Sequence, residues 1–188
     1  MTRVVAGSAG GRTLAVPPSG TRPTSERVRE ALFSRLEHLG AVDGSRVLDL
    51  YAGSGALGLE AASRGAGHVV LVDAARAAAD VCRRNVRSLG MTDRVDVVAD
   101  RADRYLARLA AGDASDLFDL VLLDPPYDLA DEALAAAVEG VARCVAPGGV
   151  VVVERSTRAA APAWPHPLVA LDDRKYGETR VWFGERPA

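Results

Sequence analysis

The distribution of apolar residues changes part-way along the chain. Before residue 40 it predicts two short strands, Arg3–Ala6 and Arg12–Val16, separated by a glycine-rich turn. A loop over 17–23 and a helix capped by Thr24 and continuing to about Leu39 should follow. From residue 46 onward, continuous apolar segments alternate with segments of helical periodicity. Apolar strands joined by helical crossovers are typical of a parallel sheet that is covered on both faces.

The second part of the chain predicts the order of these elements. Strands are expected at 46–50, 68–72, 94–98, 118–123 and 149–154, and helices near 56–64, 75–88, 101–111 and 131–144. The last apolar segments, 168–172 and 179–183, have no helix between them, so an antiparallel pair should finish one edge. The predicted fold is therefore α/β and Rossmann-like: a mostly parallel seven-stranded sheet with an antiparallel C-terminal edge, preceded by a small β-hairpin.

Length and composition limit the class of protein. The 188 residues, 48% of them hydrophobic and 26% charged, suffice for one well-buried domain with a small appendage. No segment approaches the roughly 20 apolar residues of a membrane span, and the first residues do not form a signal peptide. We therefore expect a cytoplasmic protein, a monomer without membrane contacts. The two cysteines and three histidines lack ligand spacing, so we expect reduced thiols and no metal.

Positive charge is concentrated near the start of the chain. Residues 1–40 carry a net charge of +3 and the remainder −5, although the whole chain is only −2. A basic segment on an acidic body is suited to phosphate contacts. The alternative is the solvated face of a charged helix, which explains Arg27 but not Arg3, Arg12 and Arg22, because these three lie outside the predicted helix.

A distinctive tetrapeptide, Asp124, Pro125, Pro126 and Tyr127, directly follows the apolar run 120–123. The carboxylate is a hydrogen-bond acceptor, the ring is a stacking surface, and the proline carbonyls are expected to be free to accept from a ligand. This combination suits a planar ring with an amino group, as in adenine, cytosine or guanine. An ordinary turn after a strand is the alternative, and the tetrapeptide alone does not decide between them.

The first strand of the predicted sheet leads into a glycine-rich segment, residues 49–58, that contains a GxGxxG pattern. Between a strand and a helix, such glycines let the backbone turn tightly and approach a nucleotide. The acid at the end of the strand would repel a pyrophosphate but suits the ammonium of a methionine moiety. This favours S-adenosylmethionine over a dinucleotide, and the predicted contacts are Asp49, Tyr51, Ala52, Gly53, Ser54 and Gly55, with Tyr51 near the methionine end.

Acids also follow the next two predicted strands. Asp73 lies about 20 residues beyond the first glycine, where an acid accepts both hydroxyls of a ribose. Asp100 comes just after the third strand and is expected at the adenine amine. Acids that stand alone in such positions are more often helix caps or solvated loop acids. Together with Asp49 and Asp124, however, they follow four successive strands, at the edge where open α/β sheets bind ligands.

With this set assembled, the chain resembles the class I S-adenosylmethionine-dependent methyltransferases, and residues 124–127 resemble the signature of those that modify exocyclic amines. The closer resemblance is to the bacterial 16S rRNA guanine-N2 methyltransferases. It is carried by residues 4–7, 11–14, 22–33, 49–55, 124–127 and 175–179. Residues 22–33 are its specific part, because other amine methyltransferases share the tetrapeptide but not this segment. Gly10 and Asp73 depart from the family pattern, where a basic residue and Glu are usual.

The resemblance implies that the protein transfers a methyl group from S-adenosylmethionine to the N2 amine of a guanine in 16S rRNA, within a small-subunit assembly. Asp124 and the Pro125 carbonyl would orient the amine of a base that is stacked on Tyr127, with Pro126 completing the catalytic set. Most of the acceleration would come from positioning.

The basic segment is then predicted to be an RNA-binding appendage, residues 1–23, attached to a methyltransferase domain, 24–188. The expected RNA contacts are Arg3, Arg12, Arg22, Arg27 and Arg29. The competing interpretation is a hairpin that only covers an apolar flank.

Three alternatives to this function remain at the level of sequence. One is a nucleotide-binding or ribosome-assembly module without catalytic activity. The second is an NAD-dependent oxidoreductase, and the third is an amine methyltransferase that acts on another nucleic acid or on a protein.

Overall fold

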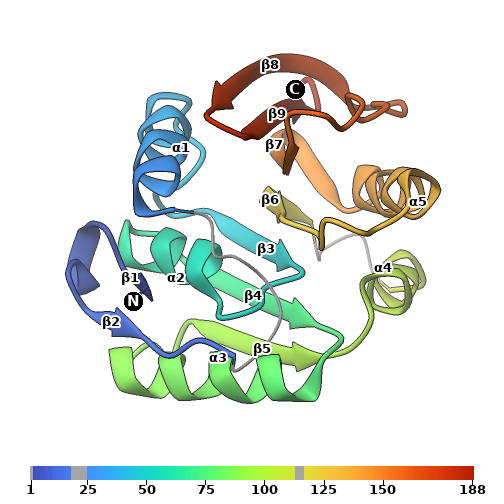
Figure 1. Ribbon diagram of the computed structural model, residues 1–188. Coiled ribbons are helices and arrows are strands. Elements are labelled where there is room, and N and C mark those ends of the chain that lie inside the picture. The colour runs from blue at the N-terminus through green and yellow to red at the C-terminus, as the bar shows by residue number, and fades with distance from the viewer. Residues whose placement is uncertain (1, 18–24, 113–116) are drawn as a thin grey trace.

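The computed structural model describes residues 2–17, 25–112 and 117–188, and a seven-stranded sheet of order β5-β4-β3-β6-β7-β9-β8 forms its centre (Figure 1). The first five strands of this sheet in chain order are parallel to one another, and β9 runs antiparallel to both β7 and β8. The predicted fold is therefore confirmed, including its antiparallel C-terminal edge. The strands are β3 (Arg46–Leu50), β4 (His68–Asp73), β5 (Val95–Ala99), β6 (Phe118–Leu123), β7 (Val145–Ser156), β8 (Val169–Tyr176) and β9 (Thr179–Glu185).

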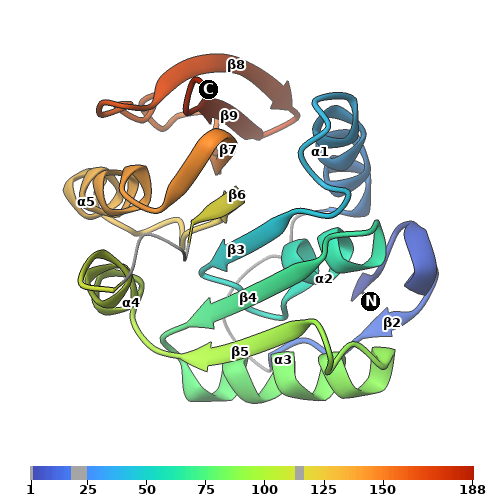
Figure 2. The same cartoon turned by 180° about the vertical axis from the view of Figure 1, so that it is seen from behind.

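Helices cover both faces of the sheet (Figures 1 and 2). One hydrophobic cluster joins α1, α2 and α3 to the sheet, and a second joins α4 and α5 to the opposite face. Successive strand residues point to opposite faces, so β3 contributes Val47 to the first cluster and Leu48 and Leu50 to the second. The helices are α1 (Glu26–His38), α2 (Ala56–Ser63), α3 (Arg76–Leu89), α4 (Ala102–Ala110) and α5 (Asp131–Ala142).

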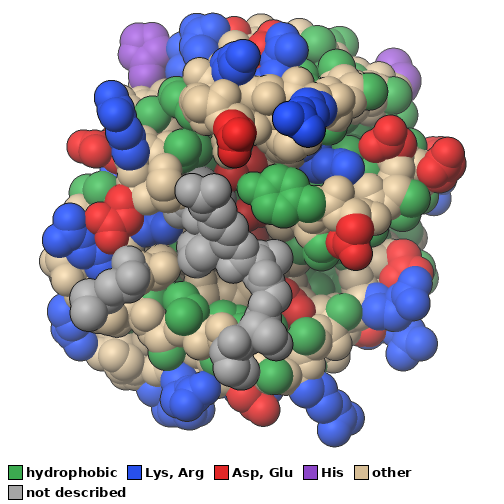
Figure 3. All heavy atoms as spheres, viewed as in Figure 1, with side chains coloured by type: hydrophobic (Ala, Val, Ile, Leu, Met, Phe, Trp, Pro, Cys, Tyr) green, Lys and Arg blue, Asp and Glu red, His purple; other side chains and the backbone are tan. Residues whose placement is uncertain are grey.

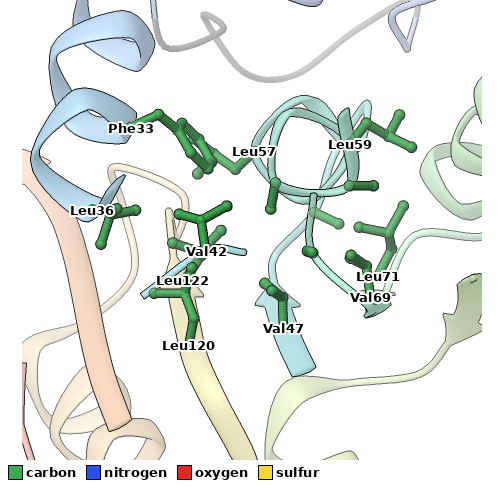
Figure 4. Close-up of a cluster of buried hydrophobic side chains, with 14 of the residues drawn as sticks. Phe33, Leu36, Val42, Val47, Leu57, Leu59, Val69, Leu71, Leu120 and Leu122 are labelled. Carbon is green, nitrogen blue, oxygen red and sulfur yellow. The ribbon is translucent and has the colours of Figure 1, made fainter. Parts of the chain in front are cut away.

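The first cluster fixes α1 and α2 against the central strands. Figure 4 shows Phe33 of α1 and Leu57 of α2 above the side chains of β3 and β6. Phe33, Val47 and Leu120 have no exposed surface. Because α2 carries the end of the glycine-rich segment, this packing holds the candidate cofactor loop in place.

The start of α1 differs slightly from the expectation. Thr24 lies outside the described residues, and so does most of the loop predicted over 17–23. The side chain of Ser25 caps the helix instead, because its Oγ accepts from the Val28 N–H at 3.3 Å. Ser is as good a cap as Thr, so the prediction of a capped helix in this position is correct although the residue is shifted by one.

An N-terminal hairpin, β1 (Thr2–Arg3) and β2 (Thr13–Leu14), encloses a 3₁₀ turn, η1 (Gly7–Ala9). Its strands are shorter than predicted. The backbone N–H groups of Val5 and Ala6 donate to the two carboxylate oxygens of Glu60 on α2, at 2.7 and 3.0 Å, instead of continuing the ladder.

The hairpin is part of the core and not a separate appendage. Val4, Ala9 and Leu14 are buried in the same cluster as α1 and α2. Gly7 approaches α2 so closely that a Cβ atom there would lie 1.9 Å from the Ser63 carbonyl oxygen, and its φ of +80° also favours glycine. The boundary predicted after residue 23 therefore does not separate two hydrophobic cores.

We expect deletion of residues 1–23 to lower the melting temperature, with a loss of about 2 kcal/mol or more in the free energy of unfolding. The reason is that Glu60, which is fully buried, loses two donors while Val4 and Leu14 are removed from the core. Thermal unfolding measures this, with Arg12→Gln in the full chain as a control that keeps the packing. An unchanged melting temperature would restore the interpretation as a separate arm.

No helix within residues 2–17, 25–112 and 117–188 has the length and apolar character that crossing a membrane requires.

Candidate functional site

Four acids gather at the carboxyl edge of the sheet. Asp100 and Asp124 directly follow β5 and β6, Asp73 is the last residue of β4, and Asp49 is next to the last residue of β3. These strands are neighbours in the order β5, β4, β3, β6. The chain leaves β3 toward β4 on one side and later returns to β6 on its other side. This point, where the strand order reverses, is where open α/β sheets bind ligands. The structure therefore brings together the acids that the sequence analysis singled out.

Asp49 is the most unusual of the four, because its side chain is only 1% exposed. Its Oδ2 accepts from the Gly58 N–H at 2.8 Å, whereas Oδ1 is buried and has no hydrogen-bond partner among the described residues. Burial raises the pKa of Asp49 to about 8, and the nearby charges of Asp124 and Asp73 act in the same direction. An ammonium group beside Oδ1 would supply the missing donor and the missing positive charge. The site thus fits the amino group of S-adenosylmethionine.

The glycine-rich loop joins these acids to α2. The Gly53 N–H donates to Asp73 Oδ2 at 2.8 Å, and the Gly55 N–H donates to the Ala52 carbonyl at 2.7 Å, which makes a tight turn. Gly55 has a φ of +80°, and a Cβ atom there would meet Leu71 of β4 at 3.0 Å. The loop therefore lies directly on the neighbouring strand, as a cradle for a nucleoside requires. Tyr51 is the one non-glycine residue with positive φ in the described part of the chain.

Two residues that sequence reasoning missed hold this loop from α3. Cys82 Sγ donates to the Gly53 carbonyl at 3.3 Å, and Asn85 Nδ2 donates to the Ser54 carbonyl at 2.9 Å. Asn85 also exchanges two hydrogen bonds with the backbone of Ala15, at 2.8 and 2.9 Å. Asn85 could have been noticed in the sequence, because it is a polar residue on the apolar face of the predicted helix, three positions after Cys82. The end of the hairpin and the cofactor loop thus share one buried amide.

Asp73 is held in a fixed orientation at the end of β4. Its Oδ2 accepts from Gly53, and its Oδ1 accepts from the Ala75 N–H at 2.8 Å. A carboxylate has about four acceptor positions, so two remain for ribose hydroxyls.

We expect Asp73→Ala to weaken binding of S-adenosylhomocysteine by about 1–3 kcal/mol, since charge-assisted hydrogen bonds are lost and the Gly53 N–H is left without its acceptor. Isothermal titration calorimetry measures the affinity. Asp93→Ala, which removes an exposed acid from the opposite edge of the sheet, serves as the control. An unchanged dissociation constant for Asp73→Ala would remove this residue from the ribose site.

Asp100 is engaged by α4. Its carboxylate accepts from the Arg101 N–H at 2.9 Å and from the guanidinium of Arg108, and Arg104 lies 3.9 Å away. Acceptor positions remain on a carboxylate with these partners, so its contact with the adenine amine stays a prediction.

Tyr51 packs against the cluster on the α4 and α5 face, where burial raises the pKa of its phenol.

The acceptor motif, Asp124–Tyr127, begins where β6 ends. Asp124 is half-buried, Pro125 is buried and Tyr127 is 62% exposed. Figure 3 shows hydrophobic and acidic side chains around a hollow near the middle of one face. The Pro126 carbonyl accepts from the Leu129 N–H at 3.0 Å, so the expectation that both proline carbonyls are free is wrong for Pro126. This bond closes a turn that contains Tyr127.

The predicted RNA contacts are dispersed by the fold. Arg29 is 1% exposed, its guanidinium donates to the Arg3 carbonyl, and burial lowers its pKa, so the prediction that it contacts RNA is wrong. Its position on the inner face of α1 explains this. Arg3 pairs with Glu26 at 2.8 Å, Arg27 is exposed, and Arg22 lies outside the described residues.

Arg12 lies far from the acids. Its Nη2 donates to the Ser88 carbonyl at 2.7 Å, in the last turn of α3. That 14-residue helix begins near Asp73 and runs back about 21 Å at 1.5 Å per residue. Arg12 is therefore at the edge of the sheet opposite the acceptor motif.

Comparison with known proteins agrees with this geometry. A family model described as Conserved hypothetical protein 95 matches residues 2–185, nearly the whole chain. The chain belongs to this family.

Relatives of this family member include YlbH of Bacillus subtilis, named as a candidate rRNA methyltransferase, which is 35% identical over 95% of this chain and 96% of its own length. Ribosomal RNA small subunit methyltransferase D of Haemophilus influenzae is 34% identical over 81% of this chain and 77% of its own length. Among solved structures, yhhF of Escherichia coli, described as a candidate methyltransferase, superposes with a TM-score of 0.85 at 28% identity, covering 98% of this chain and 97% of that protein.

The comparisons confirm the class I methyltransferase fold, and S-adenosylmethionine is the methyl donor of proteins with this fold. The residues around Asp49 fit that donor, as the unpartnered Oδ1 indicates. In the part of the chain that the structure describes, no group of three or more His, Cys, Asp or Glu side chains is arranged to hold a metal ion.

Proposed function

We propose that the protein transfers a methyl group from S-adenosylmethionine to the exocyclic N2 amine of a guanine in 16S rRNA. The proposal rests on the position of the acceptor motif, which begins at the end of β6, next to the end of β3 that carries Asp49. These two strands are paired, and the strand order of the sheet reverses between them. A relative named small subunit rRNA methyltransferase supports rRNA as the substrate class. The tetrapeptide, which suits a planar ring with an amino group, supports an exocyclic amine as the acceptor.

Three acids of the chain are assigned to the methyl donor. Asp49 binds the ammonium through its unpartnered Oδ1, Asp73 accepts from the ribose hydroxyls, and Asp100 accepts from the adenine amine. The bound donor supplies an activated methyl group on sulfur. Gly53 and Gly55 have φ values of +59° and +80°, which glycine adopts readily, so the loop can turn tightly beside the donor.

The acceptor motif acts on the base. The guanine leaves its stack, at a cost of a few kcal/mol, and stacks on Tyr127, whose ring is largely exposed. The Asp124 carboxylate and the Pro125 carbonyl accept from the two N–H groups of the amine and orient its nitrogen toward the methyl group. The Asp124 carboxylate also holds the proton that is released. Positioning of this kind supplies most of the acceleration, because the amine is a weak nucleophile.

Mass spectrometry of nucleosides from 16S rRNA tests the proposal. We expect a strain that lacks the protein to lose one N2-methylguanosine, and the wild-type chain to restore it. The Asp124→Ala chain should not restore it, although it keeps the fold. Restoration by that variant would favour a ribosome-assembly role without catalysis, and an unchanged nucleoside profile in the deletion strain would overturn the proposal. Adding purified protein to naked 16S rRNA and to small subunits identifies which one is the substrate.

A further inference from the structure

A buried arginine near the end of β7 contacts the loop that follows the acceptor motif. Arg155 is 7% exposed, and its Nη2 donates to the Leu129 carbonyl at 3.1 Å. Its guanidinium also lies 3.7 Å from Asp131, an exposed acid in the first turn of α5. The other terminal nitrogen, Nη1, is buried without a hydrogen-bond partner among the described residues. Burying a charge with incomplete pairing is unfavourable, so packing alone does not explain an arginine here.

The contact with Leu129 acts directly on the acceptor motif. Leu129 accepts from Arg155 through its carbonyl and donates from its N–H to the Pro126 carbonyl at 3.0 Å. Leu129 therefore links Arg155 to Pro126 through its own carbonyl and N–H groups. Tyr127 lies inside the turn that the bond between Leu129 and Pro126 closes. The Leu129 side chain packs against the cluster on the α4 and α5 face. The turn is thus attached to the protein at Leu129, by one charged hydrogen bond and one apolar contact.

A second arginine in the same row of the sheet provides a comparison. Arg180 on β9 is directly opposite Arg155 on β7. It donates to Asp173 at 2.8 Å and lies over the Trp182 ring, 5.6 Å from its centroid. These partners belong to β8 and β9 and not to the acceptor loop. The bond to Leu129 is therefore made by Arg155 and not by Arg180, whose side chain is also more exposed, at 41%.

We propose that Arg155 is a positioning residue of the acceptor site, which fixes the turn Pro126–Leu129 and thereby the place of the Tyr127 ring. The inference rests on the proposed function, because a base that stacks on Tyr127 is what benefits from a fixed ring. Arg155 itself touches neither the base nor the methyl donor. Its effect is to reduce the number of positions that the turn adopts before the base arrives.

Substitution by methionine separates positioning from folding. A methionine side chain in this place would fill much of the volume of the arginine stem without a charge, and replacing a buried ion by an apolar residue of similar volume is often neutral or stabilising. We therefore expect Arg155→Met to keep or raise the melting temperature. The Leu129 carbonyl loses its donor, however, so the turn opens more often.

The experiment compares Arg155→Met, Arg155→Lys and Arg180→Met with the wild-type protein. Hydrogen exchange of the Leu129 amide, followed by mass spectrometry from milliseconds onward, should be about tenfold faster in Arg155→Met, since this amide is protected by its bond to Pro126. Affinity for S-adenosylhomocysteine should be unchanged. The rate of methylation of small subunits should fall by about 10- to 100-fold, as expected for a misplaced substrate contact. Arg155→Lys, which keeps a donor, should recover part of both losses, and Arg180→Met should change neither.

Three outcomes would overturn the inference. Unchanged exchange at Leu129 in Arg155→Met would show that the guanidinium does not hold the turn. An equal loss of activity in Arg180→Met would indicate a general effect of charge on RNA binding, and a parallel loss of S-adenosylhomocysteine affinity would indicate a structural role. If the wild-type protein does not methylate rRNA, the proposed function fails, whereas the exchange measurement still decides whether Arg155 fixes the turn. If Arg155→Met does not fold, Arg155→Lys must show intermediate exchange for the inference to stand.

Discussion

Methylation of 16S rRNA by the Asp124→Ala variant is expected to fall by at least about 100-fold, while S-adenosylhomocysteine binds as tightly as before or slightly more tightly. Asp124 follows β6 on the acceptor side of the site, whereas the methyl donor is assigned to the acids at the carboxyl ends of β3, β4 and β5. The slight gain has an electrostatic reason. The charge of Asp124 raises the pKa of Asp49, so its removal favours the ionised Asp49 that an ammonium requires.

Calorimetric titration with S-adenosylhomocysteine and a methylation assay on small subunits measure the two quantities. Tyr127→Ala should likewise lose methylation activity and keep its affinity for S-adenosylhomocysteine, because the ring is assigned to the base and not to the donor. Asp128→Ala is the matched control, since it removes an exposed acid from the same turn. A loss of donor affinity in Asp124→Ala and Tyr127→Ala that is as large as the loss of activity, with the fold intact, would mean that the acceptor motif is assigned to the wrong ligand.

Binding of S-adenosylhomocysteine should become stronger as pH rises toward 8. Burial raises the pKa of Asp49 to about 8, so its carboxyl is largely protonated at pH 6 in the free protein. An ammonium group pairs only with the ionised form, and below that pKa each rise of one pH unit increases this form about tenfold. Binding should also release a proton. Calorimetry between pH 6 and 7.5, in buffers of different ionisation enthalpy, measures both the affinity and the proton release.

Asp49→Asn is the control for this dependence. It should bind S-adenosylhomocysteine weakly at every pH, because the amide supplies no charge, and should release no proton. A wild-type affinity that does not change with pH would exclude Asp49 as the partner of the ammonium.

The same shift predicts a change in stability. A carboxyl whose pKa is 3.8 in the unfolded chain and about 8 in the folded protein binds more protons in the folded state between these values. The stabilisation due to Asp49 is therefore fully present below pH 4 and is lost as pH rises through 8. Thermal unfolding of the protein without ligand should show Asp49→Asn gaining stability over the wild type across this range. No such gain would contradict the raised pKa.

The sequence predicted the features that depend on local pattern. Apolar strands with helical crossovers define the parallel sheet, and an acid at the end of a strand is placed at the carboxyl edge by the geometry of such sheets. The places of Asp49 and Asp73 therefore follow from the sequence pattern alone. The length of a short strand depends less on local sequence, because distant residues can take its backbone hydrogen bonds. The hairpin strands end early because Glu60, more than 50 residues away, takes the N–H groups of Val5 and Ala6.

Burial of single charged residues was equally inaccessible to sequence reasoning. Arg29 lies between exposed neighbours Arg27 and Glu30 in a helix, and nothing in its own segment distinguishes it from them. The hairpin, which supplies the acceptor carbonyl of Arg3, decides that it points inward. The burial of Arg155 was also not predictable from its own segment, because its partner Leu129 belongs to the loop after the neighbouring strand β6.

The hydrogen bonds of the hairpin also bear on how the chain folds during its synthesis. Val5 is separated from Glu60 by 55 residues, and Ala15 from Asn85 by 70. The backbone groups of Val5 and Ala15 therefore have no partners for these bonds until α2 and α3 have been translated. At about 5–20 residues per second, the hairpin waits for several seconds before Val4 and Leu14 can pack against these helices. Among the described residues before α1, each hairpin strand is only two residues long, and so short an edge limits the risk of aggregation during this interval.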